Sequence, residues 1–230
     1  GHATLAGGYD NDDQRNSGTI AGGDDNTVSG LASTVSGGST NEASGDFSTV
    51  TGGFENTAAG MYAVTGGWGN EANANYSTIS GGYYNVISTP GGSGTIAGGG
   101  NNQVNKQNAT VGGGFGNSAT EGGATVSGGV SNTASGDNAA VAGGVNNTAS
   151  GLYATVLGGE DNVASERYTI AGGSDCTASG ESSVALGTMA SAQHFGAFVW
   201  ADGGPSSGGT VSPGVNTFTA RATGGFYLYT

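Results

Sequence analysis

A fixed repeat constrains this sequence more than any other feature. A branched or leucine side chain follows a small residue and precedes a glycine-rich segment about every fifteen residues, as in Thr34-Val35-Ser36-Gly37-Gly38. The repeated position holds Leu5, Ile20, Val35, Val50, Val64, Ile79, Ile96, Val111, Val126, Val141, Val156, Ile170 and Val184. The composition, with 50 glycines and 9% charged residues, would otherwise suggest a disordered tract, but disorder has no such register.

Each repeat carries a second pair of regular positions. Six residues after the branched side chain an asparagine recurs in eleven repeats, and two residues further lies a second apolar position, mostly alanine. The asparagines are Asn11, Asn26, Asn41, Asn56, Asn70, Asn85, Asn102, Asn117, Asn132, Asn147 and Asn162, with Cys176 and Ala190 in the last two repeats. This spacing predicts two short strands per coil, a buried asparagine ladder and an inward-pointing branched residue.

The fold class that follows is all-β: a parallel β-solenoid, or β-roll, of about 13 coils of 14–17 residues. The repeat domain spans residues 1–194, and residues 195–230, rich in aromatic side chains, read as a β end cap or connector. The constant six-residue spacing predicts that length variation is confined to the turn that returns to the next branched residue, longest at Ser88–Gly94.

The final repeat, Ser183-Val184-Ala185-Leu186-Gly187-Thr188-Met189-Ala190-Ser191-Ala192, resembles the SVAIGxxAxA repeat of the YadA-like heads of trimeric autotransporter adhesins. The resemblance implies a left-handed β-roll, three chains side by side as a homotrimer, and the receptor-binding head of a bacterial surface adhesin. It therefore implies an extracellular or cell-surface location. Residues 195–230 resemble the segment that follows such heads in fibre proteins with a C-terminal chaperone domain, so a phage or injection-system tail fibre is the alternative.

Charge limits the partners. The chain has four basic and seventeen acidic residues, which gives a net charge of -13. Because this charge repels the phosphate backbone, nucleic acid is excluded as a partner. No stretch has the apolar length of a membrane span, and we expect no membrane insertion. The single cysteine, Cys176, replaces a ladder asparagine and is expected to be buried and inert.

Aromatic side chains supply the candidate ligand-binding residues. Seven aromatics cluster between residues 47 and 84 at predicted turns, where rings can stack on sugars or anchor a receptor, glycan or matrix partner. The predicted site residues are the six that follow Phe47 in this cluster: Phe54, Tyr62, Trp68, Tyr76, Tyr83 and Tyr84. The alternative is that these rings stack on one another along the turns.

Threonine recurs at the outward position before the branched residue in ten repeats: Thr4, Thr19, Thr34, Thr49, Thr78, Thr95, Thr110, Thr125, Thr155 and Thr169. The residue after the branched position is small in almost every repeat. Together with the threonines, these small residues predict a flat face suited to packing against another chain. Ice binding is a minor alternative, weakened because only Thr51 and Thr65 supply a second rank of threonine.

Catalysis finds no support in the sequence. The two histidines, His2 and His194, lie at opposite ends of the repeat array, and no nucleophile has a base. The acidic turns are too irregular for a calcium roll, so we predict neither a metal nor a cofactor. The expected function is a non-enzymatic extracellular structural or adhesive rod.

Overall fold

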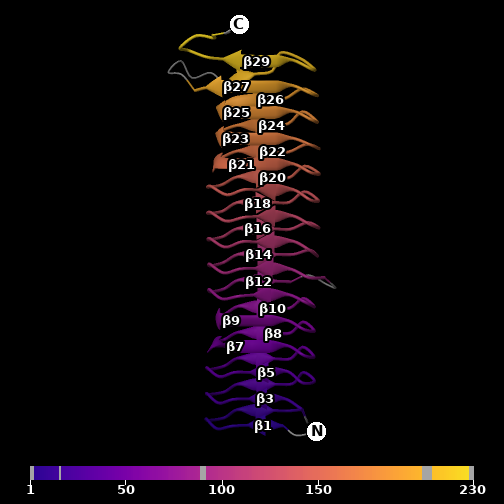
Figure 1. Ribbon diagram of the computed structural model, residues 1–230, viewed down its shortest axis with the longest axis vertical. Helices are drawn as coiled ribbons and strands as arrows, with labels where there is room; N and C mark the ends of the chain where they lie inside the picture. Colours follow the sequence, from indigo (N-terminus) through magenta and orange to yellow (C-terminus); the bar gives the residue numbers. More distant parts are fainter. Residues whose placement is uncertain (1–2, 16, 89–91, 204–208, 228–230) are drawn as a thin grey trace. The chain divides into compact units, whose positions relative to one another are not determined.

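The computed structural model describes residues 3–15, 17–88, 92–203 and 209–227, and all regular elements among them are β-strands. The chain divides into two compact units, Gly1–Gly123 and Ala124–Thr230. Each unit is a β-solenoid in which every coil contributes one strand to sheet A, made of odd-numbered strands, and one to sheet B, made of even-numbered strands (Figure 1). The predicted all-β parallel solenoid of about 13 coils is confirmed.

In unit 1, sheet A consists of β1 (Thr4–Leu5), β3 (Thr19–Ile20), β5 (Thr34–Val35), β7 (Thr49–Phe54), β9 (Val64–Trp68), β11 (Thr78–Ile79), β13 (Thr95–Ile96) and β15 (Thr110–Val111). Sheet B of this unit consists of β2 (Asp12–Asp13), β4 (Thr27–Val28), β6 (Glu42–Ala43), β8 (Thr57–Ala58), β10 (Glu71–Ala72), β12 (Val86–Ile87), β14 (Gln103–Val104) and β16 (Ser118–Ala119).

In unit 2, sheet A consists of β17 (Thr125–Val126), β19 (Ala140–Val141), β21 (Thr155–Glu160), β23 (Ile170–Ser174), β25 (Val184–Thr188), β27 (Phe198–Asp202) and β29 (Phe218–Arg221). Sheet B of this unit consists of β18 (Thr133–Ala134), β20 (Thr148–Ala149), β22 (Val163–Ala164), β24 (Thr177–Ala178), β26 (Ala190–Ala192) and β28 (Thr210–Val211). Both sheets thus extend beyond residue 194.

Like residues lie above one another. Between β5 and β7, which run parallel, Thr34 pairs with Thr49 and Val35 with Val50. Because side chains alternate across a strand, the valines point inward and are fully buried, while the threonines remain partly accessible. Alanine at the facing position of sheet B, such as Ala43, gives each coil a narrow core that the next coil covers.

The predicted asparagine ladder is confirmed. Asn41 is 1% exposed, and its Nδ2 donates to Asn26 Oδ1 at 3.1 Å, to Gly37 O at 3.1 Å and to Gly53 O at 2.9 Å. Its Oδ1 accepts hydrogen bonds from the backbone N–H and Nδ2 of Asn56, both at 3.0 Å. The same contacts recur from coil to coil, so one side chain per coil satisfies backbone groups that the thin core would leave unpaired.

The segment from the glycine pair to the ladder asparagine, which we call the glycine corner, requires glycine at the second position of the pair. Gly38 has φ +94°, and a Cβ there would overlap the carbonyl oxygen of Gly53 in the next coil. Gly37 also has a positive φ, but a Cβ on it would meet its nearest atom, Gly22 O, only at 3.9 Å. The second glycine therefore allows adjacent coils to approach.

Three coils contradict the predicted core register. Val64, Ile170 and Val184 do not point inward: Thr49 pairs with Val64 and Thr155 with Ile170, and the core position passes to the next residue. The residues that take it, Thr65, Ala171 and Ala185, are fully buried, as is Thr169, which was expected on the outward rank. In these coils the branched side chain lies on the outer face of sheet A.

The prediction that only the return turn varies in length is wrong for the same reason. Counted from the buried residue, the shortened coils lose one residue at the glycine corner, where the β7–β9 and β21–β23 pairings contain a register shift. Of the glycine pair in the coil of β9, Gly66 and Gly67, only Gly67 has a positive φ, whereas Gly52 and Gly53 both have one in the coil before. The long Ser88–Gly94 turn lies partly outside the described residues, since 89–91 are not among them.

Candidate binding surfaces

The predicted aromatic site divides between the two turns of the unit 1 coils. Phe54, Trp68, Tyr83 and Tyr84 lie at the glycine corner. Tyr62 and Tyr76 lie in the return turn, the segment from a sheet B strand to the next sheet A strand. The two turns form opposite edges of the stacked coils (Figure 1), so the six residues do not form one site.

In the return turn the rings stack on one another. Phe47 and Tyr62 have ring centroids 5.0 Å apart with an interplanar angle of 10°, and Tyr62 and Tyr76 follow at 5.3 Å and 13°. All three residues have a positive φ, 59°, 57° and 58°, an unfavourable conformation for side chains of this size. Stacking occupies the ring faces and leaves mainly edges to solvent.

At the glycine corner the rings are arranged differently. Phe54 pairs in register with Trp68, and Trp68 forms a β-bridge with Tyr83. The Trp68 and Tyr84 centroids are 5.1 Å apart at 48°, while Tyr83 meets Tyr84 edge to face at 6.2 Å and 83°. These side chains are 42–48% exposed. Ring contacts join Trp68, Tyr84 and Tyr83, and Phe54 lies next to Trp68 in the strand pairing.

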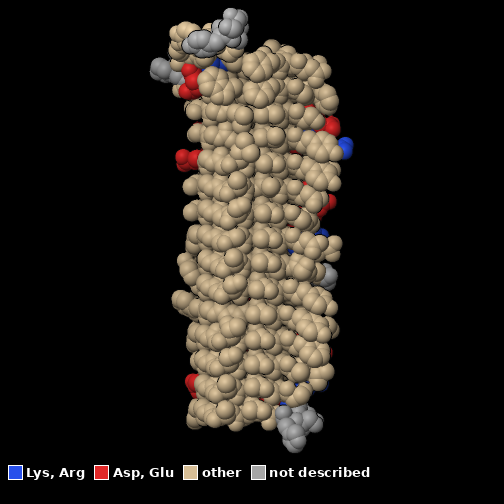
Figure 2. Space-filling model, in the orientation of Figure 1, with Lys and Arg blue, Asp and Glu red and all other residues tan. Residues whose placement is uncertain are grey.

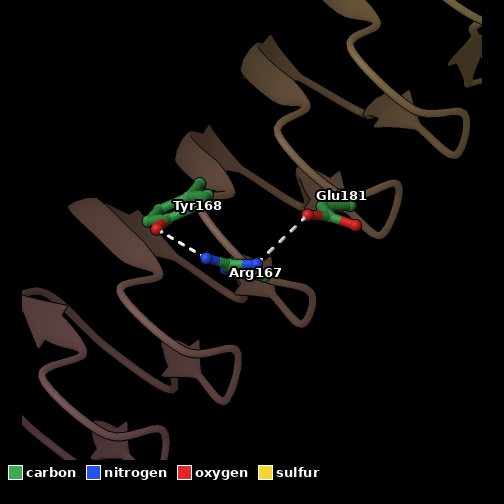
Figure 3. Close-up of polar contacts among 3 residues, drawn as sticks. All are labelled: Arg167, Tyr168 and Glu181. Atoms are coloured by element: carbon green, nitrogen blue, oxygen red, sulfur yellow. Dashed lines mark hydrogen bonds and ion pairs between the residues drawn. The ribbon is translucent and has the colours of Figure 1, made fainter.

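A polar cluster marks the return turn of unit 2 (Figure 3). Arg167 Nη2 donates to the Tyr168 hydroxyl at 2.8 Å, and Arg167 Nη1 lies 3.9 Å from Glu181 Oε1. The guanidinium carbon is 4.5 Å from the Tyr168 ring centroid, and Tyr168 stacks on Tyr153 at 5.4 Å. The hydrogen bond to Tyr168 raises the pKa of Arg167. The ion pair between the exposed side chains of Arg167 and Glu181 contributes little to the free energy of unfolding.

Among the described residues, the main outward rank of sheet A contains no charged side chain. In unit 2 this rank runs through residues joined by the strand pairings: Thr125, Ala140, Thr155, Ile170, Val184, Phe198 and Phe218. Sheet B presents Asp12, Glu42 and Glu71 at the equivalent outward position in unit 1. In unit 2 the same rank of sheet B is uncharged and runs through Thr133, Thr148, Val163, Thr177 and Ser191. On the face drawn in Figure 2, charged side chains likewise lie at the edges.

Towards the end of unit 2 this outer surface becomes apolar. Leu157 is 56% exposed and Phe218 is 69% exposed, and Leu186 pairs with Trp200 in the neighbouring outward rank. The Phe198 and Phe218 rings stack at 5.1 Å beside an apolar hollow of about 340 Å³. The hollow is lined by Phe198, Trp200, Phe218, Ala220, Ala222, Gly225, Phe226 and Tyr227. The apolar character of this face was not predicted from the sequence, because Ile170 and Val184 were expected in the core.

Groups that could support chemistry are dispersed. Within the described residues no cluster of three or more His, Cys, Asp or Glu side chains could hold a metal ion. His2 lies outside the described residues, and His194 Nδ1 lies 2.8 Å from Ser212 Oγ. Cys176 is buried as predicted, and burial raises the pKa of its thiol.

No protein-family model matches the sequence, and no curated protein matches it significantly. The described residues include no helix long and apolar enough to cross a membrane.

Proposed function

We propose that this protein is a non-enzymatic extracellular structural or adhesive solenoid, the head of a bacterial surface adhesin, and that it acts as a side-by-side homotrimer. The observation that carries the proposal lies on the outer surface of sheet A in unit 2, where the rank through Ile170, Val184 and Phe198 carries no charge and becomes increasingly apolar towards β29. An exposed apolar surface of this kind is typical of a protein interface.

The net charge of -13 favours this surface as the self-association interface. Copies that approached through the acidic positions of sheet B in unit 1, or through the acidic turns, would bring carboxylates together, and like charges oppose such contacts. Sheet B of unit 2 is uncharged in its outward rank but mainly carries threonine and serine there, so it offers less apolar surface to bury. The outward rank through Ile170, Val184 and Phe198 brings no charge to the contact, and burying its side chains supplies the hydrophobic driving force.

Light scattering of matched variants tests the proposal. We expect the wild-type protein to have three times the 22.0 kDa chain mass, and Leu157→Glu to lower that mass by placing carboxylates in the interface. Val163→Glu, in the same coil but on sheet B, is the control and should remain assembled. A monomeric wild-type protein would refute the homotrimer.

A fibre segment of a phage or injection system is the second candidate. It is favoured by the continuation of both sheets through β28 and β29, in the segment with the fibre resemblance. Binding of the purified protein to immobilised matrix proteins separates the two, because an adhesin head should bind and a spacer should not. The ice-binding alternative loses support, since buried Thr65 leaves Thr51 as the one threonine of its proposed second rank; thermal hysteresis measures it directly.

A further inference from the structure

The glycine-corner aromatics of unit 1 differ from the other exposed rings because glycines in adjacent coils support them. A Cβ at Gly69 would lie 2.7 Å from Cε1 of Tyr84, and a Cβ at Gly100 would overlap the Tyr83 ring. Each tyrosine ring therefore covers the backbone of a neighbouring coil at a position where any other residue would displace it. The rings are held in place before any ligand arrives, which reduces the entropy lost on binding.

Backbone hydrogen bonds fix the same residues. Trp68 N donates to Gly82 O, Tyr83 N to Gly99 O and Tyr84 N to Trp68 O, each at 2.9 Å. The side chains of Trp68, Tyr83 and Tyr84 nevertheless remain 48%, 42% and 45% exposed. Among the described contacts neither tyrosine hydroxyl has a hydrogen-bond partner, so both can bond to a ligand.

The charges around these rings select the ligand class. Glu55 and Asn101, exposed neighbours of Phe54 and Gly100, have positive φ angles and provide carboxylate and amide groups at the rim. The basic residues of unit 1 are Arg15 and Lys106, which lie in return turns, so no cation at the glycine corner could balance an anionic ligand.

We propose that Trp68, Tyr83 and Tyr84, with Phe54 beside them, form a binding platform for uncharged saccharide chains. One face of a pyranose ring presents C–H groups that pack flat on an aromatic face, while its hydroxyl groups can bond to the tyrosine hydroxyls, Glu55 and Asn101. The inference deepens the adhesive function proposed above and rests on it, since it names the class of surface ligand.

Isothermal titration calorimetry of the full chain tests the platform with cellohexaose, chitohexaose and maltohexaose as neutral probes. We expect at least one of them to bind, and Trp68→Ala and Tyr83→Ala to weaken it roughly tenfold or more, as for a central aromatic contact. Trp68→Phe, which keeps a ring, should retain part of the affinity. Tyr62→Ala and Tyr76→Ala, in the stacked return turn of neighbouring coils, are the controls and should leave the affinity unchanged.

Three outcomes would overturn the inference: no neutral probe binds, a heparin hexasaccharide or choline binds in preference, or Tyr62→Ala weakens binding as much as Trp68→Ala. Circular dichroism of each variant establishes that the solenoid is folded. Light scattering on the same samples separates this result from the proposed function. An assembled protein that binds no neutral probe rejects the platform alone, whereas a monomer that binds one rejects the homotrimer alone.

Discussion

Removing one rung of the asparagine ladder gives the sharpest test of what stabilises the coils. Asn41→Ala deletes the hydrogen bonds from Nδ2 to Asn26, Gly37 and Gly53, and those that Oδ1 accepts from Asn56. Nδ2 has two hydrogens to share among its three acceptors, and Oδ1 accepts two hydrogen bonds. The side chain therefore makes about four interactions, worth roughly 1 kcal/mol each. The change also leaves the buried backbone N–H of Asn56 without its acceptor.

We therefore expect Asn41→Ala to lower the free energy of unfolding by about 4 kcal/mol, a large part of the roughly 5–15 kcal/mol typical of folded proteins. In urea, followed by circular dichroism, the midpoint should fall by roughly 1 to 2 M if the slope is about 2–3 kcal/mol per M. Glu42→Ala, the next residue and exposed, should change the free energy by less than about 0.5 kcal/mol. A loss below about 1 kcal/mol for Asn41→Ala would refute the reasoning, because the ladder would then add nothing beyond bonds to water.

Further variants address other features. Cys176→Asn should extend the ladder by one rung towards Asn162, as Asn70 does in a coil of the same shortened form, and raise stability by roughly 1 kcal/mol in the same urea assay. The Cys176 thiol should resist thiol reagents in the native protein and react in urea. Because burial raises the pKa of this thiol, its contribution to the free energy of unfolding is full below the unfolded pKa of about 9.0 and is lost as pH rises through the folded pKa. The variant Cys176→Ala should not show this loss of stability at high pH. Thr65→Val replaces a buried hydroxyl that has no partner with a methyl group and should raise the melting temperature. Gly38→Ala should prevent close approach of coils and cost more than Gly37→Ala, as measured by thermal unfolding.

Much of the fold follows from the repeat itself. The asparagine ladder was predictable because one residue type recurs at one coil position, and stacked coils place like residues in contact. Alanine at the sheet B core position was predictable from the same spacing, and Ala43 and Ala58 are fully buried.

The register of the shortened coils was harder to predict because both faces of sheet A carry apolar residues there. Alternation assigns a strand's inward face only when the outward face is polar, and Val64, Ile170 and Val184 break that condition. The spacing nevertheless contained a signal. In full-length coils the buried residue follows the ladder asparagine by nine residues, as Val50 follows Asn41, and the same spacing in the shortened coils leads to Thr65 after Asn56.

The candidate site was predicted in part. The aromatic residues were identified, but their closeness in sequence suggested one patch, whereas position within the coil separates Tyr62 and Tyr76 from Trp68 and Tyr83. The support that Gly69 and Gly100 give to the tyrosine rings joins residues about fifteen positions apart, and neither glycine is distinguishable in sequence from the many others.

The one-residue shortening at the glycine corner bears on how a gene for such a chain can change in length. Coils of both lengths present the same inward positions to their neighbours, as β7 and β9 do when they pair across the shift. Tandem duplication or loss of a segment encoding one whole coil should therefore keep the core continuous, with the ladder carried along in each copy. Corner side chains, which contribute little to the core, are then free to diverge between copies, and recognition can evolve at the edge without any change to the scaffold.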